Sequence, residues 1–522
     1  MSTHAYQGVS ITVAATAAQG SYVDGQPYIV IASPTTITAI NNPPNQDYGT
    51  CTAAGGAMKN PIPMGTQGFC SHYVGTNHDP NTGGYIHAYD ASKNIQLSLP
   101  YSISPGDSIT VSIMRDDEPS TKVPVYKIVV FMFVAEAPPA GSFRPGFYGT
   151  DRSLAFNESD VQWDRLASYP RAGLTTCPSQ AYMEDEVRFP PLPWHEWGSD
   201  WTATKVRPQY NTANTNAENT AQFSATRFAD AALWINLDWT QAQKRKIVIR
   251  LIQNGIDMCS YHMAGGQMLA SGSHQTGWKF PAFLAAVLLQ DSDMLAITRN
   301  PHNFVEGNLT TYRISSSDLS RHYTLSGTDY PFLSEDVGTY WWGIQHYSQP
   351  EKDRPPTIPT ADPYQGIYGL IVPSLLAARM MQAESDWGWG IAFRYMPRHL
   401  SIFGIGTGFF SEIYNLVNPT LPSIDTVTVP LPTTPQALVK EEAFTITLSN
   451  PWGHPMRYTT NGTTPTNDST LYSTPFTVLA TTTLKARCFP TDGQDAGTVA
   501  TIPVTIITNG TPAPPTNLTF TP

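Results

Sequence analysis

The sequence is poor in charged residues and has few cysteines. Asp, Glu, Lys and Arg make up only 14% of its 522 residues. Its five cysteines are odd in number, scattered and without metal-ligand spacing, and only Cys51 and Cys70 are close enough along the chain to pair. The chain is therefore not a disulfide scaffold, and we expect neither a metal site nor another cofactor.

Long apolar runs and basic clusters are also missing. No run approaches the ~18 apolar residues of a membrane span. The net charge is −11 and the basic residues form no stripe, so we expect no nucleic-acid partner. The first twenty residues lack the basic and apolar regions of a secretory signal. We therefore expect a virion protein released by cell lysis, or an extracellular protein whose signal has been removed or whose export is non-classical.

Proline (45) and glycine (38) are abundant, which favours loops and strands over helices. The length allows about three domains. Residues 1–137 are predicted to form a β-sandwich, because Val9, Ile11 and Val13 alternate and 126–134 read as a continuous apolar core strand. A long insertion at 42–90, rich in Asn, Gly and Pro, is predicted as a binding loop or an assembly contact.

Residues 138–221 are predicted as an irregular connector with many arginine and aromatic side chains. That composition is typical of an extended segment packed on a domain surface. The alternative is an aromatic platform for a sugar ring, in which Trp194 and Trp197 would bind the ligand.

Helical patterns dominate residues 222–415. Thr240 and Gln243 form a capping box ahead of a helix from Gln241 to about Met258, and Pro281 is suited to the first turn of the apolar helix that follows. We predict a mainly helical domain of α/α type, as a bundle or partial toroid, followed by a linker at 416–436.

The segment 457–487 carries the most specific pattern in the chain. Asn461-Gly462 predicts a tight hairpin turn, and Thr464-Pro465-Thr466, Leu471-Tyr472 and a Thr-rich strand at 482–486 follow it. This order resembles the immunoglobulin-like module at the C-terminus of chitobiases and β-hexosaminidases, over about 437–508, ahead of a Pro-rich tail at 509–522. The resemblance implies an accessory β-sandwich in a carbohydrate-rich extracellular setting. A spacer without a ligand is the alternative. The predicted fold class is multidomain α+β.

Candidate chemistry is expected in two loops between the helices of this region. Glycines bracket Tyr261, His262, His274 and Lys279, residue types that can abstract a proton next to a uronate carboxylate and hold the resulting charge. A second loop supplies candidate ligand-binding residues, namely Tyr340, Trp341 and His346, and we expect both loops to line one cleft. The set is similar in kind to that of α/α polysaccharide lyases, without a motif match. A structural role for each histidine is the alternative.

Three functions remain open. The first is a bacteriophage virion protein, from a tail or head appendage, that binds a receptor among host surface glycans. The second is an extracellular polysaccharide lyase or glycoside hydrolase with an accessory C-terminal module, and the third is a purely structural surface or scaffold protein. Whether the chain is an enzyme stays undecided. The expected partners are a polysaccharide or host glycan, other virion proteins and further copies of the chain.

Overall fold

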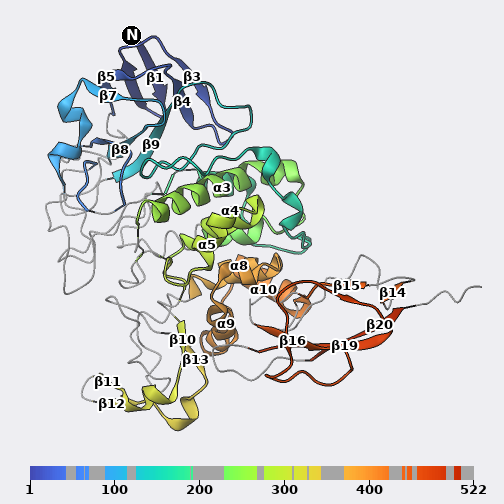
Figure 1. Ribbon diagram of the computed structural model, residues 1–522. Helices are drawn as coiled ribbons and strands as arrows, with labels where there is room; N and C mark the ends of the chain where they lie inside the picture. The colour runs from blue at the N-terminus through green and yellow to red at the C-terminus, as the bar shows by residue number, and fades with distance from the viewer. Residues whose placement is uncertain are drawn as a thin grey trace, which may run out of the picture. The chain divides into compact units, whose positions relative to one another are not determined.

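The computed structural model describes most of the chain in two compact units, Met1–Leu421 and Pro422–Pro522. Figure 1 shows the helices and strands of both units. The mixture of sheets and helices confirms the α+β class. The described residues are 1–42, 55–63, 65–69, 89–114, 125–188, 190–191, 228–266, 268, 276–307, 311–325, 328–342, 369–421, 438–440, 444–448, 455–489 and 499–506.

The first unit begins with two sheets packed on one apolar core. The first sheet has the order β1-β2-β5-β7 and the second has the order β3-β4-β9-β8-β6. Val9, Ile11 and Val13 are buried alternately on β2, and Phe131 and Phe133 meet them from β9. The strands are β1 Ser2–Tyr6, β2 Val9–Val13, β3 Ala18–Ser21, β4 Pro27–Val30, β5 Thr35–Asn41, β6 Ala57–Lys59, β7 Tyr101–Ile103, β8 Ser108–Met114 and β9 Val125–Val134.

Part of the predicted insertion belongs to this sheet. Strand β6 lies inside 42–90 and pairs antiparallel with β8, with Ala57 opposite Val111. Ala57 and Met58 are buried, so this stretch contributes to the core. The rest of the insertion is largely outside the described residues.

A mostly irregular segment follows over the described residues 135–188, with the short helix α1 (Gln180–Glu186) and two 3-10 turns, η3 (Glu158–Asp160) and η4 (Trp163–Arg165). It packs on α3 (Gln241–Met263), the longest described helix. Thr240 accepts from Gln243 N, and the Gln243 side chain accepts from Thr240 N, which confirms the capping box.

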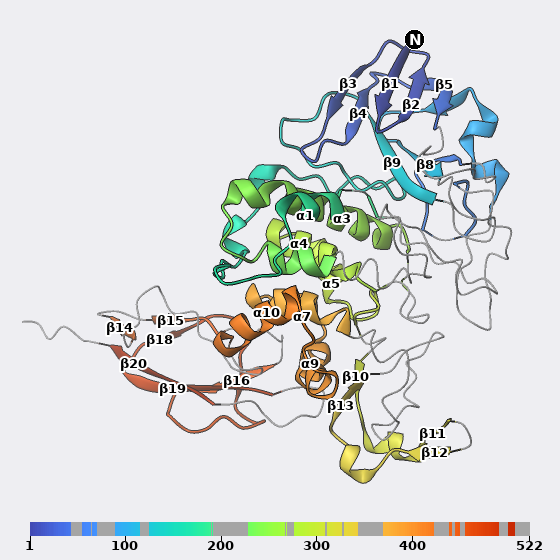
Figure 2. The same cartoon turned by 180° about the vertical axis from the view of Figure 1, so that it is seen from behind.

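Helix α3 lies beside α4 (Lys279–Leu289) in both views (Figures 1 and 2). The approach is close at Gly255, because a Cβ there would lie 2.2 Å from Pro281 O and 2.5 Å from Ala285 Cβ. Only glycine fits such a contact. Further α-helices are α5 Ser292–Arg299, α7 Val372–Met380, α8 Glu384–Trp387, α9 Gly390–Phe403 and α10 Phe409–Val417.

The region predicted as helical also contains strands. β10 (Thr311–Arg313) pairs with β13 (Tyr340–Trp342), and β11 (His322–Leu325) pairs with β12 (Thr328–Pro331). The 311–342 stretch has short apolar runs, which periodicity alone does not assign to helix or strand. The prediction of a mainly helical 222–415 is therefore wrong for this stretch. The domain boundaries at 137 and 222 stay predictions.

The second unit is a small β-sandwich. One sheet has the order β14-β20-β19-β16-β17 and the other pairs β15 with β18. Ile446 and Val478 of the smaller sheet pack on Leu484, Ala486 and Val504 of the larger. The strands are β14 Leu438–Lys440, β15 Phe444–Ile446, β16 Met456–Thr459, β17 Thr470–Leu471, β18 Phe476–Val478, β19 Thr482–Cys488 and β20 Ala500–Ile506.

The turn at Asn461-Gly462 differs from the predicted tight hairpin. Gly462 has φ +77°, but Asn461 is not among the residues of positive φ. The pair of β16 and β17 nearest the turn is Tyr458 with Thr470, so eleven residues connect the paired positions. Asn461 Oδ1 instead accepts from Thr463 N at 3.1 Å and Thr463 Oγ1 at 2.6 Å. The asparagine thus stabilises a longer loop through its side chain.

Candidate functional site

Three of the four predicted catalytic residues lie on or beside one helix-helix junction. Tyr261 and His262 occupy the last turn of α3, and Lys279 is the first residue of α4. The prediction that they lie in loops is therefore wrong, because α3 continues five residues past Met258. The rings of Tyr261 and His262 are 5.4 Å apart and nearly perpendicular.

His262 is held as a neutral imidazole. Its Nδ1 lies 3.1 Å from the carbonyl oxygen of Gly266, so Nδ1 donates to that oxygen and Nε2 is left as the acceptor. Nε2 is buried and has no hydrogen-bond partner among the described residues. Burial lowers the pKa of His262 to about 4.

Lys279 is an unusual buried lysine. Its side chain is 0% exposed, and its Nζ lies 5.0 Å from the ring centre of Trp387 and 5.8 Å from that of Phe304. Nζ forms no hydrogen bond within the part of the chain that the structure describes. Burial lowers the pKa of Lys279 to about 7, and the nearby Glu306 carboxylate opposes this shift.

Glu306 completes the cluster and was not predicted. Its Oε1 accepts from Gly277 N at 2.6 Å and from Lys279 N at 3.4 Å, at the start of α4, where free N–H groups favour an anion. Its Oε2 is buried without a partner in the described structure, and burial raises the pKa of the carboxyl. No local pattern in the sequence pairs Glu306 with Lys279, since 26 residues separate them.

Together, these groups form a buried acid–base cluster, defined here as Tyr261, His262, Lys279 and Glu306. An amine and an imidazole that lose their protons near or below neutral pH are suited to accept a proton. However, Lys279 is 0% exposed and Tyr261 and Glu306 are each 1% exposed, so a substrate has no direct access in this conformation. Burial also raises the pKa of Tyr261. The geometry therefore favours a structural role for the cluster over catalysis.

Tyr340 and Trp341 lie on β13 and contact α9. Arg394 Nη1 donates to Tyr340 Oη at 3.3 Å, and the guanidinium of Arg398 lies 4.9 Å from the ring centre of Trp341. Tyr395 adds an edge contact to Trp341, with ring centres 5.9 Å apart. These contacts form a group of their own, and a cleft shared with Lys279 stays a prediction.

Other predicted residues fall outside the described ranges, namely His274, His346, Trp194, Trp197, Cys51 and Cys70. Within those ranges, no three His, Cys, Asp or Glu residues gather as metal ligands, and no helix is long and apolar enough to cross a membrane.

The second unit is a two-sheet sandwich, and its sequence identifies it. Residues 435–501 match the family model of the chitobiase/β-hexosaminidase C-terminal domain. This unit carries a chitobiase-type module. The match confirms the resemblance predicted from the Thr-Pro-Thr and Leu-Tyr patterns, and the module has the expected two-sheet core. A comparison with curated proteins finds no match to the chain.

Proposed function

We propose that the protein recognises glycans and that its chitobiase-type module takes part in this recognition. The observation that carries the proposal is the family match over 435–501. Modules of this kind accompany carbohydrate-active proteins, and a fold alone does not define a ligand. The proposal therefore goes no further than a carbohydrate as the binding partner.

The enzyme and the virion protein, the two more specific functions, differ in their support. The buried state of Lys279 weighs against a polysaccharide lyase or glycoside hydrolase that uses the acid–base cluster. The virion setting and the contact with a host receptor rest on the sequence only, and the family match adds no support to them.

Binding of the full-length chain to a panel of soluble polysaccharides, both neutral and acidic, tests the proposal. We expect at least one polysaccharide in an affinity gel to retard the protein. Leu484→Asp places a charge in the module core, where Leu484 is 0% exposed, and should abolish the retardation. Thr477→Asp adds the same charge at an exposed position of the module and should not.

Two results would refute this function. The first is that no polysaccharide in the panel retards the wild-type chain. The second is that Leu484→Asp is retarded as strongly as Thr477→Asp, which would place any binding outside the module.

A further inference from the structure

The two faces of the larger sheet of the module differ in chemistry. On β19, Leu484, Ala486 and Cys488 point into the core, so Thr483, Lys485 and Arg487 point to the other face. Residues 435–501 have four basic and five acidic residues, so the module as a whole has no positive charge. A positively charged face of this module therefore arises from where its basic residues lie and not from an excess of them.

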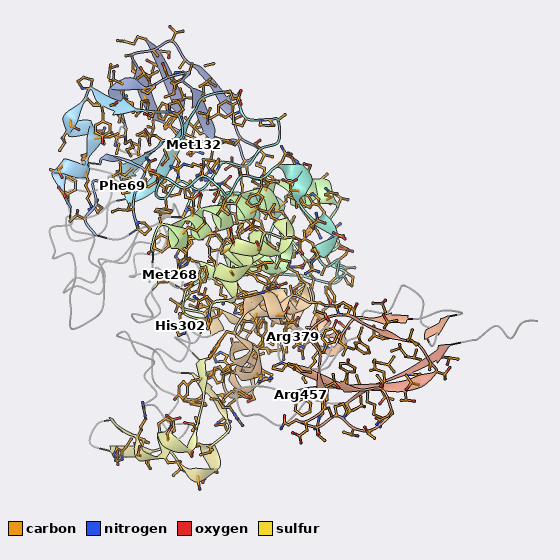
Figure 3. All side chains as sticks on the ribbon, viewed as in Figure 1. Phe69, Met132, Met268, His302, Arg379 and Arg457 are labelled. Atoms are coloured by element: carbon orange, nitrogen blue, oxygen red, sulfur yellow. The ribbon has the colours of Figure 1, made fainter. Side chains whose placement is uncertain are left out.

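Strand register brings three cationic side chains together on the outer face. Arg457 of β16 is directly opposite Arg487 of β19. In the next row, Thr459 is opposite Lys485, which in turn is opposite Thr501 of β20. Figure 3 labels Arg457 on this sheet. Among the described residues of the module, Asp468 is the single acid, and it lies in the loop before β17.

Two like charges in directly opposite positions destabilise a sheet, since their Cβ atoms are about 5 Å apart. Local contacts hold both arginines in place. Arg457 Nη1 donates to Ser469 O at 2.6 Å, and the guanidinium of Arg487 lies 5.9 Å from the ring centre of Phe489. A face that brings two guanidinium groups next to each other in register is suited to an anion.

We propose that the outer face of this sheet binds an anionic glycan, with carboxylate or sulfate groups held by Arg457, Arg487 and Lys485. The proposal rests on the glycan recognition proposed above and names the class of glycan. Guanidinium groups bind carboxylate and sulfate in a bidentate manner, and the threonines of the same face supply hydroxyls for sugar hydroxyls. Leu471, 50% exposed and opposite Arg457, adds apolar surface at the sheet edge.

The test is affinity electrophoresis of the full-length chain in gels that contain polygalacturonate, dextran sulfate or unmodified dextran, with a mobility shift on duplex DNA as a further arm. We expect retardation by one or both anionic polymers, with the two arms separating carboxylate from sulfate recognition. Arg457→Gln with Arg487→Gln should weaken it about tenfold or more. The binding should fall as salt is raised, because exposed charges are screened.

The matched control removes two charges elsewhere. Arg245→Gln with Lys246→Gln lies on the exposed side of α3, where both cations pair with glutamates at the surface. Such pairs contribute little to stability, so this variant should bind within about twofold of wild type. Lys485→Gln provides a milder variant if the double arginine change does not fold.

Each outcome is decisive. Retardation by unmodified dextran alone, or equal losses in the arginine variant and the control, overturns the anionic site and leaves glycan recognition standing. If the double arginine variant and Lys485→Gln both bind as strongly as the wild type, the anionic site is overturned too. A stronger shift with duplex DNA than with either anionic polymer replaces the glycan by a nucleic acid. Failure of all three polymers overturns the anionic site, and the wider panel described above then decides on glycan recognition.

Discussion

Arg144 Nη2 lies 2.5 Å from Asp257 Oδ2, and both side chains are fully buried. Arg144 belongs to the irregular segment after the first sandwich, and Asp257 belongs to α3. The same guanidinium donates to Gln26 Oε1 at 2.8 Å, in the turn between β3 and β4. One side chain thus ties the N-terminal sheets to the helices within the unit Met1–Leu421.

Arg144→Ala is expected to destabilise the first unit by about 3–5 kcal/mol, because it leaves the Asp257 carboxylate buried without its partner. Burial already raises the pKa of Asp257 to about 7, against the opposing effect of Arg144. Urea unfolding followed by tryptophan fluorescence measures the loss. Arg245→Ala, which breaks an exposed pair with Glu158, should cost at most about 1 kcal/mol. Equal costs for the two variants would contradict the prediction.

The Lys279 amine should make stability rise with pH. Its folded pKa is about 7 and its ordinary value is 10.5, so between these pH values the unfolded chain binds a proton that the folded chain does not. The contribution of Lys279 to the free energy of unfolding is therefore fully present above about pH 10.5. It is lost as the pH falls towards 7, by at most about 1.4 kcal/mol per pH unit.

The measurement compares Glu306→Gln with Glu306→Gln/Lys279→Met, since the glutamine removes the coupled carboxyl. The unfolding free energy of Glu306→Gln should rise from pH 7 to pH 10 relative to that of Glu306→Gln/Lys279→Met, because only the first variant keeps the amine. A constant difference would show that the amine is not desolvated.

His262 should make the stability of the first unit fall in acid. Burial lowers its pKa from 6.5 to about 4, so the folded state favours the neutral ring. The stability from this residue is present above about pH 6.5 and is lost as the pH falls towards 4. His262→Asn keeps a donor for the Gly266 carbonyl but does not titrate, so its stability should fall less between pH 6.5 and 4. Thermal unfolding at the two pH values checks this, and identical slopes would argue against a buried imidazole.

Gly462 tests the loop of the module. Its φ of +77° disfavours a side chain, although the nearest atom to an added Cβ, Thr483 Cβ, is 3.6 Å away. Gly462→Ala should therefore destabilise the module by about 1 kcal/mol through backbone strain alone. Gly462→Asn should cost less, since Asn tolerates positive φ. Hydrogen exchange of β16 and β19 reports both effects, and a larger loss for Asn than for Ala would contradict this explanation.

Local signals in the sequence predicted local structure well. Val9, Ile11 and Val13 alternate as a half-buried strand must, and Thr240 with Gln243 marks the start of α3. Helix α3 ends five residues later than the predicted Met258, because Cys259 and Tyr261 continue its buried face. Strands β10 and β13 were missed, since three-residue strands carry too short a pattern.

The candidate site was predictable only in part. Tyr261, His262 and Lys279 stand out because they lie at the ends of two helices that are consecutive in the described chain. Glu306 joins them through packing of the turn after α5, which no spacing records. The cationic face is similar: Arg457 and Arg487 become neighbours only through the register of β16 and β19.

The close contact between Gly255 and Pro281 fixes the position of α3 along the axis of α4. A slide of α3 by one residue, about 1.5 Å along its axis, would bring Asn254 or Ile256 towards the Pro281 carbonyl, where even a Cβ has no room. A shift of one residue in the register of α3 against α4 is therefore excluded by steric overlap. The spacing of Tyr261 and His262 from Lys279 is accordingly fixed by a residue two turns away that carries no side chain.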